Sequence, residues 1–230
     1  MVIYGLQKLS LLDFPGKTAC TVFTGGCNWR CPFCHNASLV TALNTVEPVP
    51  EEEFFTFLNK RKGILDGVCI TGGEPLLQPD IINFIKEIRE FGYSIKLDTN
   101  GSFPDKLKEV VNSGLVDYVA MDIKNSPDNY PLTTGISDVD MTNIYESAEF
   151  LMSGKVDYEF RTTVVKELHS QADFEKISEW LKGAKKLFLQ SFTDSGDILG
   201  GTFSAHSKSE LEKFKSILEK NIPCVSIRGV

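Results

Sequence analysis

Three cysteines stand within eight residues of this chain, at Cys27, Cys31 and Cys34, with the spacing C-x3-C-x2-C. Because they are so close in sequence, one loop can present all three thiolates to a single centre. A [4Fe–4S] cluster is normally held by four thiolates, so a cluster on these three keeps one iron free to bind another molecule. The motif therefore predicts an iron–sulfur cluster with an open iron.

A zinc site is the alternative for the same residues. The three motif cysteines and His35 would give four ligands, but structural zinc sites usually pair two C-x2-C knuckles or close with a distant pair of histidines. We expect no disulfides, because no secretory leader precedes the motif. The other cysteines stand alone in the sequence, at Cys20, Cys69 and Cys224. Iron–sulfur is favoured, and zinc stays open.

Length and composition predict a soluble globular protein of ordinary size. The 230 residues are 42% hydrophobic and 24% charged, which suits one domain over residues 1–230 with a sizeable core. The formal net charge of −7 argues against nucleic acid as a partner. No apolar run is long enough to span a membrane. Unpaired thiols and an oxygen-sensitive cluster favour the reducing cytoplasm.

Strand-like and helix-like segments alternate along the chain. Residues 17–24, which run into the cysteine motif, are β-branched and apolar and predict a buried strand. We expect further strands at residues 67–71, 94–97, 118–121, 158–164 and 186–191, with a seventh at 224–227. We expect helices at residues 50–62, 79–88, 104–112, 141–152, 174–181 and 210–219.

This alternation predicts an α/β fold with a parallel sheet and right-handed crossovers. Six units fall short of the eight that close a full barrel, so we expect a partial (β/α)6 barrel. Its core is expected at about residues 17–192, with 193–230 as a C-terminal extension. Chemistry in such folds gathers at the C-terminal ends of the strands. The expected strand ends carry Cys27, Glu74, Asp98, Asp122 and Arg161, so we expect one shared site.

The cysteine motif, with Phe33 just before its last cysteine, resembles the signature of the radical S-adenosylmethionine (SAM) superfamily. The glycine pair at 25–26 and the tail CHN at 34–36 are similar to the glycyl-radical-enzyme activating proteins. The opening segment SLLDFPGK at 10–17 resembles the longer type of anaerobic ribonucleoside-triphosphate reductase activating protein. The likeness covers most of the chain and is strongest up to about Lys124.

The resemblance implies a [4Fe–4S] cluster on the three motif cysteines, whose open iron chelates the amino and carboxylate groups of SAM. It implies that Gly73 and Glu74, in the segment GGEP at 72–75, bind the amino end of that cofactor. Phe33 would cover the adenine or the cluster edge. His35 and Asn36 would pack and form hydrogen bonds within the loop.

Asp98 and Asp122 follow neighbouring expected strands. Two carboxylates at such a place make an oxygen-rich environment for a hard cation, although a lone acid is more often a helix cap or a surface charge. Similar positions in the pyruvate formate-lyase activating enzyme hold a monovalent cation near the sulfonium. By this resemblance Asp98, Thr99 and Asp122 would hold such a cation.

Lys124 stands two residues beyond Asp122, on the same side of the extended chain. It matches a D-x-K element of these activators, whose lysine meets the carboxylate or ribose of the cofactor. Arg161 is expected to add a charge-assisted contact, with a strand-edge salt bridge as the alternative. The activating enzyme used for comparison carries a histidine after its sixth strand. This chain reads LQSF there, at 189–192, so we assign no histidine.

The resemblance implies reductive cleavage of SAM at its C5′–S bond by one electron from the cluster, giving methionine and a 5′-deoxyadenosyl radical. That radical would abstract a hydrogen from a backbone glycine of a partner glycyl radical enzyme, expected to be anaerobic ribonucleotide reductase. Reduced flavodoxin or ferredoxin would be the electron donor. The polar loops 125–135 and 194–202 are expected to line the edge where the partner's glycine loop enters.

Other functions stay open on the sequence. One is activation of a pyruvate formate-lyase-type enzyme. Another is radical chemistry on a small molecule, as in a deazaguanine-forming synthase of similar length. The last is a zinc-binding interaction module without catalysis, which would be colourless and rich in zinc when purified anaerobically.

Overall fold

Parallel strands form the centre of the structure, a computed structural model that describes residues 1–194 and 196–229. The central strands are β2 (Ala19–Thr24), β3 (Gly67–Gly72), β4 (Ser94–Thr99), β5 (Tyr118–Asp122), β6 (Asp157–Val164) and β7 (Lys186–Ser191). Each pairs in parallel with the next along the chain. The α/β class with parallel strands is therefore confirmed, and their shared direction brings their C-terminal ends to one edge.

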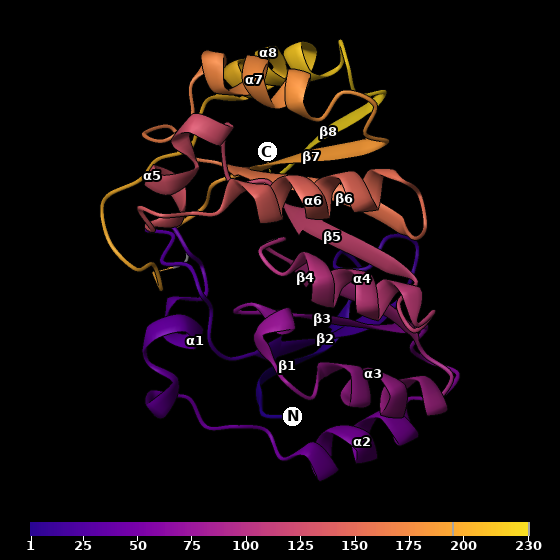
Figure 1. Ribbon diagram of the computed structural model, residues 1–230. Helices are drawn as coiled ribbons and strands as arrows, with labels where there is room; N and C mark the ends of the chain where they lie inside the picture. The colour runs from indigo at the N-terminus through magenta and orange to yellow at the C-terminus, as the bar shows by residue number, and fades with distance from the viewer. Residues whose placement is uncertain (195, 230) are drawn as a thin grey trace.

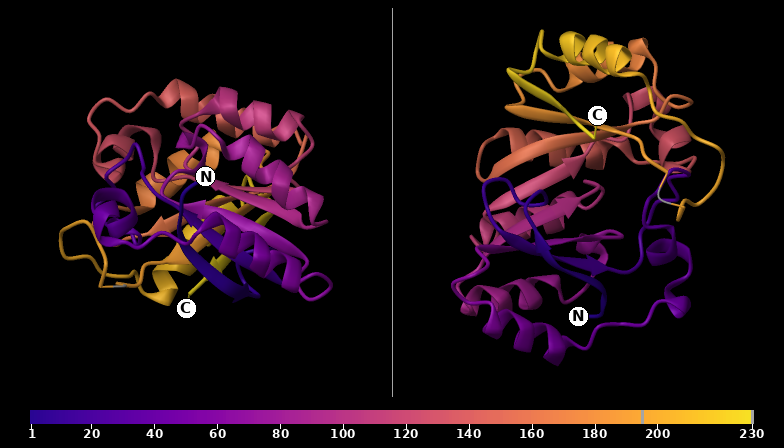
Figure 2. Two further views of the ribbon diagram at one scale, coloured as in Figure 1. Left: turned by 90° about the horizontal axis from the view of Figure 1, so that it is seen from below. Right: turned by 180° about the vertical axis from the view of Figure 1, so that it is seen from behind.

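Long helices cover one face of this sheet (Figures 1 and 2). They are α2 (Glu51–Lys60), α3 (Ile81–Glu90), α4 (Pro104–Asn112), α6 (Met141–Met152), α7 (Gln171–Trp180) and α8 (Lys208–Leu218). In α3 the buried residues Ile81, Phe84, Ile85 and Ile88 follow the spacing of one helical face. Burying each such side chain is worth about 1.5–3 kcal/mol. None of the helices in the described ranges is long and apolar enough to cross a membrane.

A first strand, β1 (Ile3–Ser10), was not expected from the sequence. It pairs antiparallel with β2 and covers that edge of the sheet. Half of its length is polar or glycine, and its residues Gln7 to Leu9 are exposed. A polar edge strand lacks the apolar run that marks a buried one, so periodicity could not reveal it.

The opposite edge of the sheet is β8 (Cys224–Arg228), which pairs in parallel with β7. The strands lie in the order β1 to β8, and among the described residues β1 and β8 do not pair. The sheet is therefore curved but open, as a partial barrel requires. Figure 1 shows the succession from β1, near the N-terminus, to β8, near the C-terminus.

Short helices occupy the connections at the C-terminal edge. They are α1 (Ala37–Thr41), α5 (Tyr130–Thr134) and the 3-10 turns at Leu43–Thr45, Pro75–Leu77 and Pro127–Asn129. The expectation of a polar loop at 125–135 was thus wrong. Tyr130 is fully buried, and its ring meets the edge of Trp29 with centroids 5.9 Å apart. The Thr134 carbonyl accepts from the Arg30 N–H at 2.8 Å, so α5 packs on the cysteine motif instead of lining an entrance.

Candidate active site

A cavity lies at the C-terminal ends of β3 to β7, bounded by the segment from Cys27 to Asn36, which we call the cysteine loop. Every site residue expected from the sequence lines this cavity, with the exception of Glu74. The residues that line it are Cys27, Trp29, Cys31, Phe33, Cys34, His35, Asn36, Val40, Thr71, Gly72, Gly73, Asp98, Thr99, Asn100, Asp122, Lys124, Arg161, Thr163 and Gln190. Segments far apart in the sequence thus converge on one place.

The cysteine loop is fixed by backbone hydrogen bonds. It leaves β2 through Gly26, whose φ of 82° favours glycine. The Gly26 N–H donates to the Leu39 carbonyl at 2.8 Å, which ties the start of the loop to α1. The Cys34 N–H donates to the Cys31 carbonyl at 3.0 Å, which makes a tight turn between these two thiols.

The three thiols of this loop lie in an environment that favours their uncharged form, with Cys31 buried and Cys27 and Cys34 half-buried. Burial raises the pKa of the Cys31 thiol to about 12, and it also raises the pKa of Cys27 and Cys34. As thiolates they would also repel one another, although nearby Lys124 opposes this effect. The Trp29 N–H already points at the Cys27 sulfur, 3.4 Å away. Backbone donors of this kind are how proteins tune iron–sulfur clusters, so the donor set fits a cluster.

The zinc alternative would take His35 as a fourth ligand beside the three motif cysteines. The His35 ring packs against Phe192 at a tilt of 55°, with ring centroids 5.4 Å apart, in the packing role expected for it. Cys20 and Cys69 are fully buried in the sheet and Cys224 is exposed on β8, so none of them belongs to the cavity.

The glycine pair after β3 closes on the cysteine loop. A Cβ on Gly73 would lie 1.9 Å from the Gly26 carbonyl oxygen, so only glycine fits there. The Asn36 side-chain amide donates to the Gly72 carbonyl at 3.0 Å, which confirms the hydrogen-bonding role expected for Asn36. The backbone of Gly72 and Gly73 is therefore held at the cavity wall within reach of a ligand.

Glu74 requires a correction, because its carboxylate is not at the cavity surface. The side chain is fully buried, and its two oxygens accept from the Leu76 N–H at 3.0 Å, the Thr99 hydroxyl at 2.9 Å and the Asn100 N–H at 2.7 Å. Burial raises the pKa of Glu74 to about 7, although these three donors oppose the rise. Glu74 therefore joins the glycine turn to the end of β4.

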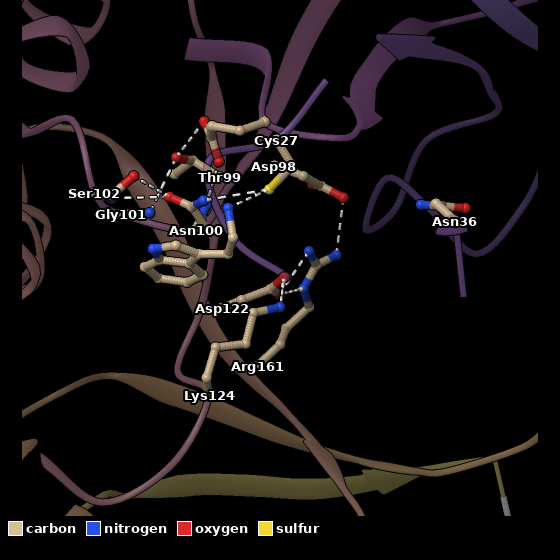
Figure 3. A network of polar contacts seen from close by, with 12 residues as sticks. Cys27, Asn36, Asp98, Thr99, Asn100, Gly101, Ser102, Asp122, Lys124 and Arg161 are labelled. Carbon is tan, nitrogen blue, oxygen red and sulfur yellow. Dashed lines mark hydrogen bonds and ion pairs between the residues drawn. The ribbon is translucent and has the colours of Figure 1, made fainter. Parts of the chain in front are cut away.

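One side of the cavity carries four charged groups, Asp98, Asp122, Lys124 and Arg161, which we call the charged wall (Figure 3). Arg161 lies between the two acids, with nitrogens 2.9 Å from the Asp98 Oδ2 and 2.9 Å from the Asp122 Oδ1. Lys124 Nζ lies 2.9 Å from the other oxygen of Asp122. Arg161 thus makes its charge-assisted contacts with carboxylates of the protein, as the salt-bridge alternative predicted.

These ion pairs decide the charge state of the acids. Burial alone would raise the pKa of Asp122, but the positive charges of Lys124 and Arg161 outweigh burial and lower it to about 2. The pKa of Asp98 is also lowered, because Arg161 and Lys96 outweigh its burial. In the other direction, Asp122 raises the pKa of Lys124 despite burial. All four groups of the charged wall are therefore ionised near neutral pH.

The expected monovalent cation site at Asp98, Thr99 and Asp122 is not formed. Lys96, which is 1% exposed, donates to Asp98 Oδ1 from two residues earlier on β4. Two carboxylates are thereby matched by three cationic side chains, and the Thr99 hydroxyl donates to Glu74. No negative charge is left over to attract a further cation. Lys96 was missed because a lysine in a strand is usually taken to face water.

The cavity lining beyond Arg161 is uncharged. Thr163 of β6 and Gln190 of β7 lie side by side in register and line the cavity, and we call this pair the neutral wall. Sequence analysis did not identify either residue. Thr163 stands two residues after Arg161 and so shares its face of the strand, which is the signal that could have revealed it.

Two further cavity residues were also missed. Asn100, at the end of β4, donates to the Asn28 side chain at 2.9 Å. Its side-chain nitrogen lies 3.9 Å from the Cys27 sulfur (Figure 3). Trp29 packs against Tyr130 and lines the cavity. Both lie beside motif residues, but their identity carries no signal of its own in the sequence.

Residues 196–206 cross over the cysteine loop after β7. Ser38 donates its hydroxyl to Asp197 at 2.8 Å, and the Gly200 N–H donates to the Pro32 carbonyl at 3.1 Å. Of the segment 194–202, expected at the entrance, all but Ser195 lies within the described residues. It contacts the cysteine loop directly.

A family model described as the radical SAM superfamily matches residues 21–189 of the chain. The chain belongs to the radical SAM superfamily. It is therefore an oxidoreductase that uses a [4Fe–4S] cluster and SAM, and the three thiols that meet at the cavity fit that cluster.

Two proteins that are similar to this chain are named as activating enzymes. A protein of Methanocaldococcus jannaschii that carries the name of a glycyl-radical enzyme activating enzyme is 30% identical over 238 residues, covering 100% of this chain and 96% of that protein. A pyruvate formate-lyase-activating enzyme of Clostridium pasteurianum is 32% identical over 141 residues, covering 58% of this chain and 57% of that enzyme.

The fold recurs in a solved radical SAM structure. The crystal structure of Streptococcus suis SuiB bound to S-adenosylmethionine superimposes with a TM-score of 0.69 at 14% identity, covering 90% of this chain and 49% of that one. At this identity the likeness concerns the fold alone. It agrees with the open parallel sheet described above.

Proposed function

We propose that this radical SAM enzyme generates a glycyl radical on a partner enzyme, and that the partner is an anaerobic ribonucleotide reductase. The similarity to an activating enzyme over the whole chain carries the first part. The segment SLLDFPGK at 10–17 motivates the second. In that segment Phe14 is buried against Tyr118 at the N-terminal end of the sheet, and Asp13 accepts from Thr21 at 2.6 Å.

Each cofactor contact is assigned to a group at the cavity. Cys27, Cys31 and Cys34 would hold the cluster, because their sulfurs reach one cavity from one loop. The backbone of Gly72 and Gly73 would bind the amino group of SAM, and Lys124 its carboxylate or ribose. Phe33 is buried at the cavity wall and supplies an apolar surface for the adenine or the cluster edge. Residues 1–230 would act as one catalytic domain.

The chemistry balances with a low-potential one-electron donor, for which we propose reduced flavodoxin or ferredoxin in the cytoplasm. When bound, the cluster and SAM supply methionine and a 5′-deoxyadenosyl radical at the cost of one electron. This radical would take a hydrogen atom from a glycine C–H bond to form the C5′–H bond of 5′-deoxyadenosine, and the unpaired electron would stay on the glycine. The chain's part is to bind, to orient and to exclude water from this exchange.

The cluster ligands are tested by replacing each cysteine with alanine, reconstituting anaerobically, and counting iron and sulfide. Cys31→Ala should lose the cluster, whereas Cys20→Ala should retain it because Cys20 is buried away from the cavity. A loss in Cys69→Ala as complete as in Cys31→Ala would refute the assignment.

The partner is tested by mixing the reduced, cluster-loaded protein and SAM with an anaerobic ribonucleotide reductase or with a pyruvate formate-lyase. A glycyl radical in the electron paramagnetic resonance (EPR) spectrum of the reductase alone is the expected result. A radical on the lyase alone would mean that the partner is a pyruvate formate-lyase-type enzyme. If only a purine or pterin analogue stimulates cleavage of SAM, the protein acts on a small molecule and not on a partner enzyme.

A further inference from the structure

The neutral wall has free hydrogen-bonding capacity. Within the part of the chain that the structure describes, neither the Thr163 hydroxyl nor the Gln190 carboxamide has a hydrogen-bond partner, yet both line the cavity. By contrast, each group of the charged wall already has an ionic partner. Free polar groups at a cavity surface can bind a ligand without giving up a contact within the protein, and here they are uncharged.

Charge separates the ligand groups that each side of the cavity can receive. SAM carries an amino group, a carboxylate and a sulfonium beside its neutral ribose and adenine, and the glycine backbone after β3 and the charged wall at the ends of β4, β5 and β6 are suited to the charged groups. The neutral wall lies beyond Arg161 on β6 and on the neighbouring strand β7, and it carries no charge to match the charged groups of SAM, so the ribose and adenine are the only groups of SAM that compete for it. Its natural ligand is a neutral group that both donates and accepts a hydrogen bond.

A glycine residue in a peptide presents that kind of group and little else. It has no side chain, so its recognisable polar features are the N–H and C=O of its flanking peptide bonds. A glutamine carboxamide carries a donor and an acceptor that complement a peptide bond, and a threonine hydroxyl can serve as either. Burying a peptide bond without such partners costs free energy, which gives the wall a reason to supply them.

We propose that Gln190, with Thr163 beside it, binds the backbone amide of the target glycine and so orients its C–H bond in the cavity. This rests on the proposed glycyl radical function. The two residues are positioning residues for the peptide. Both come from adjacent parallel strands in register, so their spacing is set by the sheet and not by a loop. That rigidity suits recognition of a backbone, which offers no other feature to select.

Peptide binding without turnover tests the proposal. The probe is a blocked pentapeptide, alanine–alanine–glycine–alanine–alanine, added to cluster-loaded protein with saturating SAM and no reductant. Its dissociation constant is compared with that of the ester analogue, in which an oxygen replaces the glycine N–H. In Gln190→Met the peptide should bind about tenfold more weakly, and Thr163→Val should cost about threefold. The ester should bind the unchanged protein more weakly than the amide peptide does. It should bind Gln190→Met as well as the amide peptide does.

Thr162→Val is the matched control. Thr162 neighbours Thr163 on β6, is buried, and its hydroxyl has no partner within the described residues. The same replacement of a hydroxyl by a methyl group should therefore leave peptide affinity unchanged. Under turnover, Gln190→Met should raise the KM for a peptide with α-deuterated glycine far more than it lowers kcat, as measured by deuterium in 5′-deoxyadenosine.

Several outcomes would overturn the proposal. One is unchanged peptide affinity in Gln190→Met. Another is an equal ester penalty in both proteins, and a third is a weakened affinity for SAM instead of peptide. These results differ from a failure of the proposed function, in which the unchanged protein would neither bind the glycine peptide nor place a radical on any partner.

Discussion

The charged wall and the neutral wall line the same cavity but are built differently. In the charged wall, Arg161 is shared between Asp98 and Asp122, and Lys124 completes the series. In the neutral wall, Thr163 and Gln190 stand in register without side-chain partners among the described residues. One region is thus held together by its own contacts, and the other has its contacts still to make.

This difference separates stability from recognition. Removing one member of a buried ion pair leaves an uncompensated charge, which proteins tolerate poorly. Removing a free hydroxyl or carboxamide leaves no partner unsatisfied in the protein itself. We therefore expect changes in the charged wall to affect folding and the cofactor, and changes in the neutral wall to affect the peptide substrate alone.

Arg161→Met should have the largest effect. It leaves the two acids of the charged wall buried with one fewer cation, and breaking a buried pair typically costs about 3–5 kcal/mol. Urea unfolding of the apoprotein measures the free energy of unfolding. Phe188→Leu, in register with Arg161 on β7, is the packing control and should cost clearly less. Equal losses in the two variants would mean that the ion pairs contribute little.

Lys124→Ala should weaken SAM binding about ten- to a hundredfold, the effect of losing one charge-assisted contact of about 1.5–3 kcal/mol. Asp122→Ala should do the same, because Asp122 holds the Lys124 ammonium in position at the cavity. Titration of SAM into the reduced protein, followed by EPR, measures this while iron content confirms an intact cluster. If the affinity for SAM is unchanged in both variants, the residues at the end of β5 do not bind the cofactor.

Glu74→Gln should lower the free energy of unfolding by about 1–3 kcal/mol. The amide nitrogen of the new side chain would face a backbone N–H that now donates to a carboxylate oxygen. The Asn100 N–H and the Leu76 N–H lie at opposite oxygens of Glu74, so one of them must lose its acceptor. Thermal unfolding at pH 8 measures the effect. If the variant is as stable as the unchanged protein but fails to bind SAM, Glu74 contacts the cofactor directly.

Thr163→Val should have the smallest effect on the folded protein, within about 0.5 kcal/mol, because its hydroxyl has no partner among the described residues to lose. The same urea titration used for Arg161→Met provides the comparison on one scale. A loss above about 2 kcal/mol would show that the neutral wall is stabilised by contacts like those of the charged wall, and the contrast between them would fail.

The sequence was most informative where chemistry demands a fixed residue type. Three thiols in one short loop, and a glycine pair that must approach Gly26, left few alternatives, and the alternation of segments predicted the parallel sheet. The cavity then assembled where strand ends meet, as the fold class requires. These features depend on local spacing, which a sequence displays directly.

The errors concern residues whose surroundings are set by distant parts of the chain. Glu74 was taken for a ligand because its neighbours Thr99 and Asn100, which satisfy its carboxylate, lie 25 and 26 residues away. The cation site was expected because Lys96 was not seen to share the face of Asp98. Gln190 lies in the stretch 189–192, which was compared with the histidine of a related activating enzyme, but it was not assigned because a neutral residue on a strand gives no sign of facing a cavity. Each needed the register of the sheet.

The most direct test of the division between the walls is a crossed pair of titrations. SAM and the glycine pentapeptide are each titrated into Lys124→Ala and Gln190→Met, the peptide at saturating SAM. Lys124→Ala should weaken SAM binding at least tenfold and change peptide binding less than about threefold, and Gln190→Met should show the reverse. If Gln190→Met weakens SAM binding as much as Lys124→Ala does, both walls bind the cofactor and the account is wrong.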